Sequence, residues 1–289
     1  LQVFVSYRNY AKYLKWLSLS LLAYVLSLLI VKVDWSQLAF HTVVPSLEFS
    51  KEQIILICGI LGTTISPYLF FWQTSQEVEE EIEQGRTTIK ERQATTTKQE
   101  MKRMRVDVWV GMFYSNFVMF AIIATCAATL YAAGVTNIES ATDAAAALKP
   151  LAGHFAYLLF TIGIIGIGLS SVPVLAGSAG YGIAESLRWN EGLSKKWSQA
   201  KLFYGTIIVS MLIGLGLNFV NIDPIKALIY AAVLNGIVAP FMIVYIVRIS
   251  ASKKIMNHWA NGRFTNAIGW ITAVAMFIVG AAAIWALLP

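Results

Sequence analysis

Residues 62–73 of this 289-residue chain read Gly62-Thr63-Thr64-Ile65-Ser66-Pro67-Tyr68-Leu69-Phe70-Phe71-Trp72-Gln73. The stretch lies inside an uncharged segment, 53–76, which is long enough to cross a bilayer as a helix. Pro67 interrupts that helix, because proline has no backbone N–H to donate. Backbone groups freed at bilayer depth cannot bond to lipid, so they must be buried in protein or line a polar cavity. A broken apolar helix is typical of a transporter's substrate site.

The composition indicates an all-α polytopic membrane protein. Hydrophobic residues make up 57% of the chain and charged residues only 13%, against roughly 25% charged in soluble domains. Long uncharged runs recur along its whole length. We therefore expect a single transmembrane domain, residues 1–289, with about seven spans. Their approximate positions are 14–33, 54–76 (broken at 63–67), 107–133, 154–184, 202–220, 226–248 and 267–288.

The distribution of positive charge predicts how these helices are oriented. Eighteen of the 22 Lys and Arg residues fall in alternate flanks and loops, at 1–15, 76–105, 188–201 and 248–263. The other four are Lys32, Lys51, Lys149 and Lys226. Because positively charged loops stay in the cytoplasm, we expect the first group, and the N-terminus of this chain, to be cytoplasmic. The net charge of +6 then reflects orientation and not nucleic-acid binding.

The uncharged run at 150–184 is long enough to hold two short spans. Two spans there would reverse the orientation of everything that follows and abolish the charge bias between the two sides. One long helix, bent near Pro173, preserves that bias and is the interpretation we adopt.

The start of the chain reads as an internal position of a longer polypeptide. Leu1 is not an initiator methionine, no signal peptide precedes it, and residues 3–15 form an amphipathic lead into the first span. We expect the C-terminal part of a larger protein, whose partners are its missing N-terminal helices and the lipid bilayer. The expected location is the bacterial inner (plasma) membrane.

Enzyme chemistry has little support in this sequence. Asp and Glu are absent from the interiors of the seven expected spans, and neither an HExxH nor a GxSxG motif occurs. Intramembrane proteases and hydrolases need such groups to activate water or a nucleophile. We expect no enzymatic activity and no cofactor.

The polar groups around Pro67 can form part of a metal site. Pro67 frees carbonyl groups about one turn earlier, and the Thr63 carbonyl and the Ser66 hydroxyl lie three residues apart, so both can converge on one ion. Oxygen ligands suit hard cations such as Mg²⁺ or Mn²⁺. An ordinary proline kink, whose carbonyls bond to the Thr and Ser hydroxyls, explains the residues equally well.

Further polar residues extend this candidate pathway. Its expected lining is Thr64, Pro67, Tyr68, Gln73 and Asn235. An asparagine such as Asn235 also commonly joins helices by hydrogen bonds. Five glutamates within 77–83 follow the break. They could attract cations, or they could form a solvated helix end.

Two stretches resemble the natural-resistance-associated macrophage protein (NRAMP) family of divalent metal transporters. They are Leu1-Gln2-Val3-Phe4-Val5-Ser6-Tyr7-Arg8, and Gly62-Thr63-Thr64-Ile65-Ser66-Pro67-Tyr68 leading into Glu77-Val78-Glu79-Glu80-Glu81. The resemblance covers nearly the whole chain, but only the part of the family from its fifth helix onward. It implies a LeuT-type fold of two inverted five-helix repeats plus an added helix, of which this chain carries the C-terminal portion. The family's Asp-Pro-Gly-Asn type motif is not in this chain, so any metal site here is half a site.

The second half of the family's metal site departs from the usual pattern. Typical members carry Met-Pro-His where this chain has Ser66-Pro67-Tyr68, and a second histidine where it has Gln73. A methionine sulfur favours transition metals, whereas serine suits a hard or hydrated ion. Losing both histidines removes the groups that carry protons near neutral pH. These departures resemble the NRAMP-related magnesium transporter branch.

The resemblance therefore implies transmembrane transport of divalent metal cations by alternating access, with Mg²⁺ (or Mn²⁺) favoured and the ion as substrate. Thr63 and Ser66 are the expected metal ligands. One alternative is a proton-coupled Mn²⁺/Fe²⁺ transporter. Others are a LeuT-type symporter of organic substrates and, in another class, a non-transporting membrane scaffold or regulatory fragment.

Overall fold

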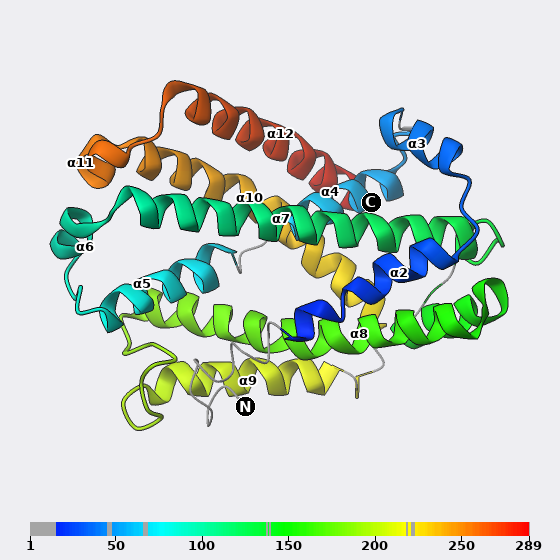
Figure 1. The fold of residues 1–289 in the computed structure, drawn as a ribbon, viewed down its shortest axis with the longest axis horizontal. Coiled ribbons are helices and arrows are strands. Elements are labelled where there is room, and N and C mark those ends of the chain that lie inside the picture. The colour runs from blue at the N-terminus through cyan, green and yellow to red at the C-terminus, as the bar shows by residue number, and fades with distance from the viewer. Residues whose placement is uncertain are drawn as a thin grey trace. The chain divides into compact units, whose positions relative to one another are not determined.

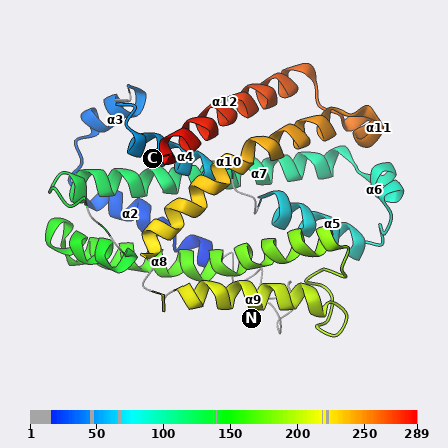
Figure 2. The same ribbon diagram turned by 180° about the vertical axis from the view of Figure 1, so that it is seen from behind.

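The computed structural model describes residues 16–44, 48–65, 69–136, 138, 140–217, 219–220 and 223–288. Within these ranges every regular element is a helix and no strand occurs (Figures 1 and 2). The prediction of an all-α chain is confirmed. The helices form two compact units, Leu1–Ser46 with Gln99–Ile225 and Leu47–Lys98 with Lys226–Pro289.

The first unit is organised around its longest helix, α8. Tyr24 of α2 meets Phe160 of α8 edge to face, with ring centroids 5.1 Å apart. Gly163 makes this contact possible, because a Cβ there would overlap the Tyr24 ring. On its other side α8 packs against α9, so it lies between α2 and α9 (Figure 1). The elements are α2 (Leu22–Ile30), α3 (Trp35–Val43), α7 (Lys98–Cys126), η2 (Ala127–Tyr131), α8 (Ala141–Leu187) and α9 (Lys201–Leu217).

The second unit is built from a short apolar helix, α4, held by two long ones, α10 and α12 (Figure 2). Cys58 of α4, Val233 of α10 and Ala283 of α12 are buried together in one apolar cluster. The elements are α4 (Lys51–Thr64), η1 (Leu69–Gln73), α5 (Thr74–Glu83), α6 (Ile89–Thr95), α10 (Pro224–Ala251), α11 (Lys253–Met256), η3 (Asn257–Trp259) and α12 (Arg263–Leu287).

Four helices in the described part of the chain are long and apolar enough to cross a membrane. A fifth span results if Trp16–Ile30 and Trp35–Val43, which meet at 116°, are counted as one. The helices within the expected spans 54–76 and 202–220 are shorter, since α4 has 14 residues and α9 has 17. The four long helices are Lys98–Tyr131, Gly153–Leu187, Pro224–Ala251 and Arg263–Leu287.

The bend in α8 lies at Gly153 and not at Pro173, where the sequence analysis placed it. Gly153 has φ 86° and ψ 170°, while Pro173 keeps helical dihedral angles. A positive φ is accessible to glycine without strain. The segment from Gly153 to Leu187 therefore continues as one helix through Pro173.

Candidate functional site

The candidate site lies at the C-terminal end of α4, whose N-terminal end is firmly held. The Ser50 hydroxyl accepts a hydrogen bond from the Gln53 N–H at 3.2 Å and so caps the helix. Lys51 donates from Nζ to the Leu288 carbonyl at 2.8 Å and lies 5.7 Å from the centre of the Trp285 ring. These contacts attach the beginning of α4 to the end of α12.

α4 ends at Thr64, and the next described helix begins at Leu69. Ile65 has left the helical conformation, with φ −102° and ψ 65°, although its N–H still donates to the Leu61 carbonyl at 3.0 Å. α4 therefore ends inside the segment 63–67, where the sequence predicts an interruption. Ser66, Pro67 and Tyr68 themselves lie outside the described residues.

The threonine hydroxyls at the break are directed back along α4. Thr63 and Thr64 both donate from Oγ1 to the Ile60 carbonyl, at 2.8 and 2.9 Å. They therefore do not bond to the carbonyls that the proline affects. Because Pro67 has no backbone N–H, it cannot donate a hydrogen bond to the Thr63 carbonyl four residues earlier. This carbonyl is the group expected to face an ion.

The end of α4 is in direct backbone contact with α10. A Cβ added to Gly62 would overlap the Ala232 carbonyl oxygen and lie 2.5 Å from the Gly236 nitrogen. A Cβ on Gly236 would lie 2.6 Å from the Cys58 carbonyl oxygen. Small residues allow this close approach of two helices in a membrane. No side-chain layer separates the helices here.

This contact places two predicted site residues on neighbouring backbone. Thr63 follows Gly62, and Asn235 precedes Gly236. Thr63 is exposed and Asn235 is partly exposed, so neither side chain is sealed inside the crossing. The glycines of this contact were not predicted, although Ala232-x-x-x-Gly236 on α10 has the small-x-x-x-small spacing that is typical of close helix packing.

Apolar packing surrounds the break on the side of α10 and α12. Leu61 and Ile65 of α4 pack against a cluster of buried residues from these two helices. Its members are Ala239, Ile243, Val247, Ala273 and Met276.

Beyond the break, the chain resumes as a π-helix, η1, which leads directly into α5. Gln73 ends η1 and is partly buried, and the neighbouring Trp72 is buried. Ser75 and Gln76, in the first turn of α5, are also buried. Short π-helical turns frequently occur at functional sites. The predicted lining residue Gln73 therefore lies at the start of a buried polar segment.

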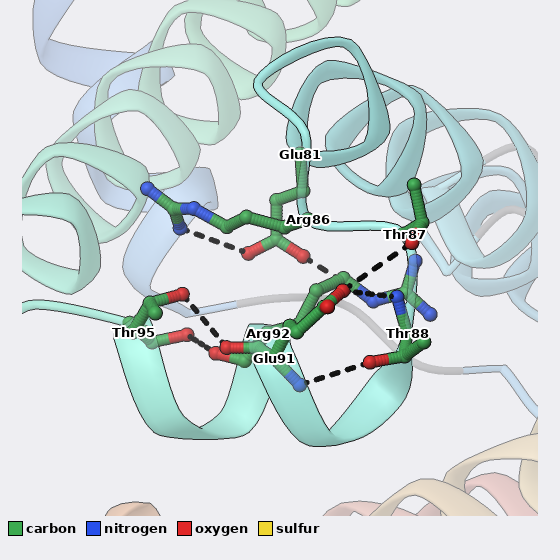
Figure 3. Close-up of polar contacts among 8 residues, drawn as sticks. Glu81, Arg86, Thr87, Thr88, Glu91, Arg92 and Thr95 are labelled. Carbon is green, nitrogen blue, oxygen red and sulfur yellow. Dashed lines mark hydrogen bonds and ion pairs between the residues drawn. The ribbon is translucent and has the colours of Figure 1, made fainter.

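Among the glutamates that follow, Glu81 forms ion pairs with two nearby arginines (Figure 3). Glu81 lies 3.7 Å from both Arg86 and Arg92, measured between carboxylate oxygens and guanidinium nitrogens. The described residues contain no group of three or more His, Cys, Asp or Glu side chains that could hold a metal ion. A solvated, locally paired helix end fits this geometry.

A capping box fixes the start of α6 within this charged segment (Figure 3). The Thr88 N–H donates to Glu91 Oε2 at 2.9 Å, and the Glu91 N–H donates to Thr88 Oγ1 at 3.2 Å. The hydrogen bond from the Thr88 backbone, more than any other contact, holds the pKa of the Glu91 carboxyl below its ordinary value. At the end of α6, Gln93 donates from Nε2 to the Ile255 carbonyl of α11 at 2.7 Å.

Comparisons with known proteins identify the family of this chain. Residues 1–286 match the family described as natural resistance-associated macrophage protein-like. Three relatives carry the name divalent metal cation transporter MntH. The one from Caldanaerobacter subterraneus subsp. tengcongensis is 29% identical over 89% of this chain and 56% of its own length. The relative from Clostridium acetobutylicum is 25% identical over 89% of this chain and 55% of its own length. The relative from Klebsiella pneumoniae subsp. pneumoniae is 28% identical over 89% of this chain and 57% of its own length. The chain spans about half the length of these curated relatives.

Proposed function

Because this chain belongs to the natural resistance-associated macrophage protein-like family, we propose that the complete protein moves divalent metal cations across a membrane by alternating access. The observation that carries the proposal is the end of α4 at Thr64, three residues before Pro67, at a point where α4 touches the α10 backbone. Broken helices of this type place polar backbone at bilayer depth, where a permeating ion can replace its hydration shell.

The proposed ligands on this chain are the Thr63 carbonyl oxygen and the Ser66 hydroxyl, the latter directly or through a bridging water. Pro67 supplies the break that leaves the Thr63 carbonyl without its helical donor. Tyr68 and Gln73 line the pathway on the side of α5, and Thr64 and Asn235 border it on α4 and α10. The remaining ligands come from the part of the protein that precedes this chain.

For the ion itself, we propose that Mg²⁺ is favoured, with Mn²⁺ second. The support is the residue set Ser66, Tyr68 and Gln73, which offers oxygen ligands without methionine sulfur or histidine. Proton-coupled transport of Mn²⁺ or Fe²⁺ is the second candidate, because relatives of this chain are named divalent metal cation transporters.

The proposed orientation places the basic loops 76–105, 188–201 and 248–263 in the cytoplasm, in the inner membrane of a bacterium. Passage through the protein then carries the ion from the Thr63 side of the break toward α5. Accessibility of single cysteines introduced at Lys254 and Lys149 to a membrane-impermeant reagent tests this orientation, because the two positions should react from opposite sides.

The function is tested by uptake of Mg²⁺ and Mn²⁺ into proteoliposomes that contain the complete protein and an internal pH dye. Mg²⁺ entry without acidification supports the proposal. Mn²⁺ entry with acidification, and no Mg²⁺ entry, supports the proton-coupled candidate instead. Absence of flux for both ions would refute transport.

The ligand assignment is tested by Ser66→Met in the same assay. A thioether at this position should shift selectivity from Mg²⁺ toward Mn²⁺ and Cd²⁺. We expect a change of about tenfold in the ratio of uptake, which corresponds to a difference of about 1.4 kcal/mol in binding free energy between the ions. The matched control is Ser170→Met, a serine in the continuous helix α8. Unchanged selectivity of Ser66→Met would show that Ser66 does not face the ion.

A further inference from the structure

The loop between α8 and α9, residues 188–200, has a defined shape because two buried tyrosines hold it. Tyr181 of α8 is 1% exposed, and its hydroxyl accepts a hydrogen bond from the Leu193 N–H at 3.2 Å. Tyr204 of α9 is 2% exposed, and its hydroxyl donates to the Lys195 carbonyl at 2.7 Å. The middle of the loop is thus tied to both helices.

The two tyrosines are themselves fixed by close packing between α8 and α9. The Tyr181 and Phe203 rings lie 4.8 Å apart, and the Phe203 and Tyr204 rings 5.1 Å apart. Gly180 allows this approach, because a Cβ there would lie 2.9 Å from the Ile207 side chain. The base under the loop is therefore rigid.

This loop carries an open polar pocket with a volume of about 480 Å³. The side chains that line it can all donate hydrogen bonds, and none is a carboxylate. The side-chain oxygen of Gln199, Oε1, already accepts a hydrogen bond from the Lys196 N–H at 2.9 Å, so the side-chain NH₂ group is the part left to meet a ligand. The lining residues are Asn190, Lys195, Ser198 and Gln199. Such a donor set suits an anion.

The surroundings of the pocket are positively charged and lie where the chain leaves an apolar helix. Residues 188–201 contain four cationic side chains and a single carboxylate, Glu191. Trp197 is 42% exposed, and its ring lies 5.9 Å from that of Tyr204. Tryptophan is enriched at membrane surfaces, and nearby Lys and Arg attract anionic headgroups. The cationic residues are Arg188, Lys195, Lys196 and Lys201, all exposed.

We propose that this pocket binds the phosphate-bearing headgroup of an anionic phospholipid. Lys195 neutralises the phosphate, and Asn190, Ser198 and Gln199 donate hydrogen bonds to its oxygens or to the headgroup hydroxyls. Trp197 lies at the level of the headgroups beside it. A lipid is the source of the phosphate because α8 and α9 are apolar and deliver the loop to the bilayer surface. The proposal is independent of the transported ion.

The test uses the complete protein, freed of lipid and titrated with phosphatidylglycerol or phosphatidylcholine, with bound lipid counted by native mass spectrometry. Phosphatidylglycerol should bind more tightly than phosphatidylcholine. Lys195→Gln should weaken phosphatidylglycerol binding about fivefold, as expected for one cationic contact at a membrane surface. Lys195→Arg should retain it. Lys254→Gln, an exposed lysine of α11, is the matched control and should change nothing.

Three results would overturn the proposal. Equal affinity for the two lipids would show that the charge of the headgroup does not determine binding. Equal phosphatidylglycerol binding by the wild type and Lys195→Gln would show that the lipid does not bind in this pocket. Full displacement of phosphatidylglycerol by inorganic phosphate, with phosphate binding as tightly in the absence of lipid, would identify a free-phosphate site instead.

Discussion

Two apolar helices of this chain contain a proline and continue through it, whereas a third ends three residues before its proline. α8 keeps helical geometry at Pro173, and α10 runs unbroken from Pro224 to Ala251 with Pro240 inside it. α4, in contrast, ends at Thr64, ahead of Pro67. Proline alone therefore does not decide whether a membrane helix breaks.

Side-chain hydrogen bonds near the proline do not explain the difference. In α8 the Ser170 hydroxyl donates to the Gly166 carbonyl at 2.8 Å, much as Thr63 and Thr64 donate to Ile60 in α4. Both helices thus have hydroxyl groups that bond to backbone one turn earlier.

Packing around the backbone does distinguish the two helices. Near Pro173 the side chains of Leu169 and Leu175 are 58% and 52% exposed, so one side of α8 faces outward here, while Ala176 and Ser178 are buried on the other. A break there would leave backbone groups in lipid, at a cost of several kcal/mol each. At the end of α4, Gly62 is buried against α10. A break is tolerated where protein already surrounds the backbone.

The largest effect, on metal uptake, should come from replacing Pro67 and Pro173 by alanine in two separate variants. Pro67→Ala returns an N–H that can bond to the Thr63 carbonyl, so the helix can extend and the proposed ligand is lost. We expect metal uptake to fall by on the order of a hundredfold, the loss expected when a reacting or binding group is misplaced by about 1 Å. Pro173→Ala should leave uptake unchanged. Proteoliposome flux measures both, and equal losses would contradict the distinction between α4 and α8.

A smaller effect is expected from filling the crossing of α4 and α10. Gly62→Ala places a Cβ against the Ala232 carbonyl and should destabilise the protein by about 1–3 kcal/mol, as overpacking does. Gly168→Ala is the control in α8, because a Cβ there would meet no atom within 4 Å. Unfolding midpoints in detergent compare the two. If both variants unfold like the wild type, the backbone contact is not part of the stable structure.

The smallest effect concerns pH and the capping box of α6. The pKa of Glu91 is lowered by its contact with the Thr88 N–H. Its contribution to helix stability is therefore present at and above the ordinary carboxyl pKa and is lost as pH falls through the lower pKa of the folded chain. Hydrogen exchange of a peptide covering 86–96 should lose protection over that acidic range. Glu91→Gln, which has no titrating group, should show no such loss.

The end of α4 near Pro67 could be predicted from the sequence, but the residues that surround this end could not. Pro67 among hydroxylated residues predicts an interruption because the missing N–H is a local property. The contact of Gly62 with Gly236 joins residues far apart in the chain, and no local pattern specifies which helix meets Gly62. The bend of α8 was expected at Pro173 and occurs at Gly153, because the helix keeps its dihedral angles at the proline and a glycine permits the positive φ of the bend.

The backbone contact between α4 and α10 also restricts how this protein can change over evolutionary time. In most cores a larger residue at one position can be accommodated by a smaller one opposite. Gly62 and Gly236 already carry the smallest residue, and the nearest atoms opposite Gly62 all belong to the main chain of Ala232 and Gly236. A larger residue at position 62 thus cannot be compensated by a smaller side chain on α10, and this restriction lies beside the two polar residues that border the proposed ion path.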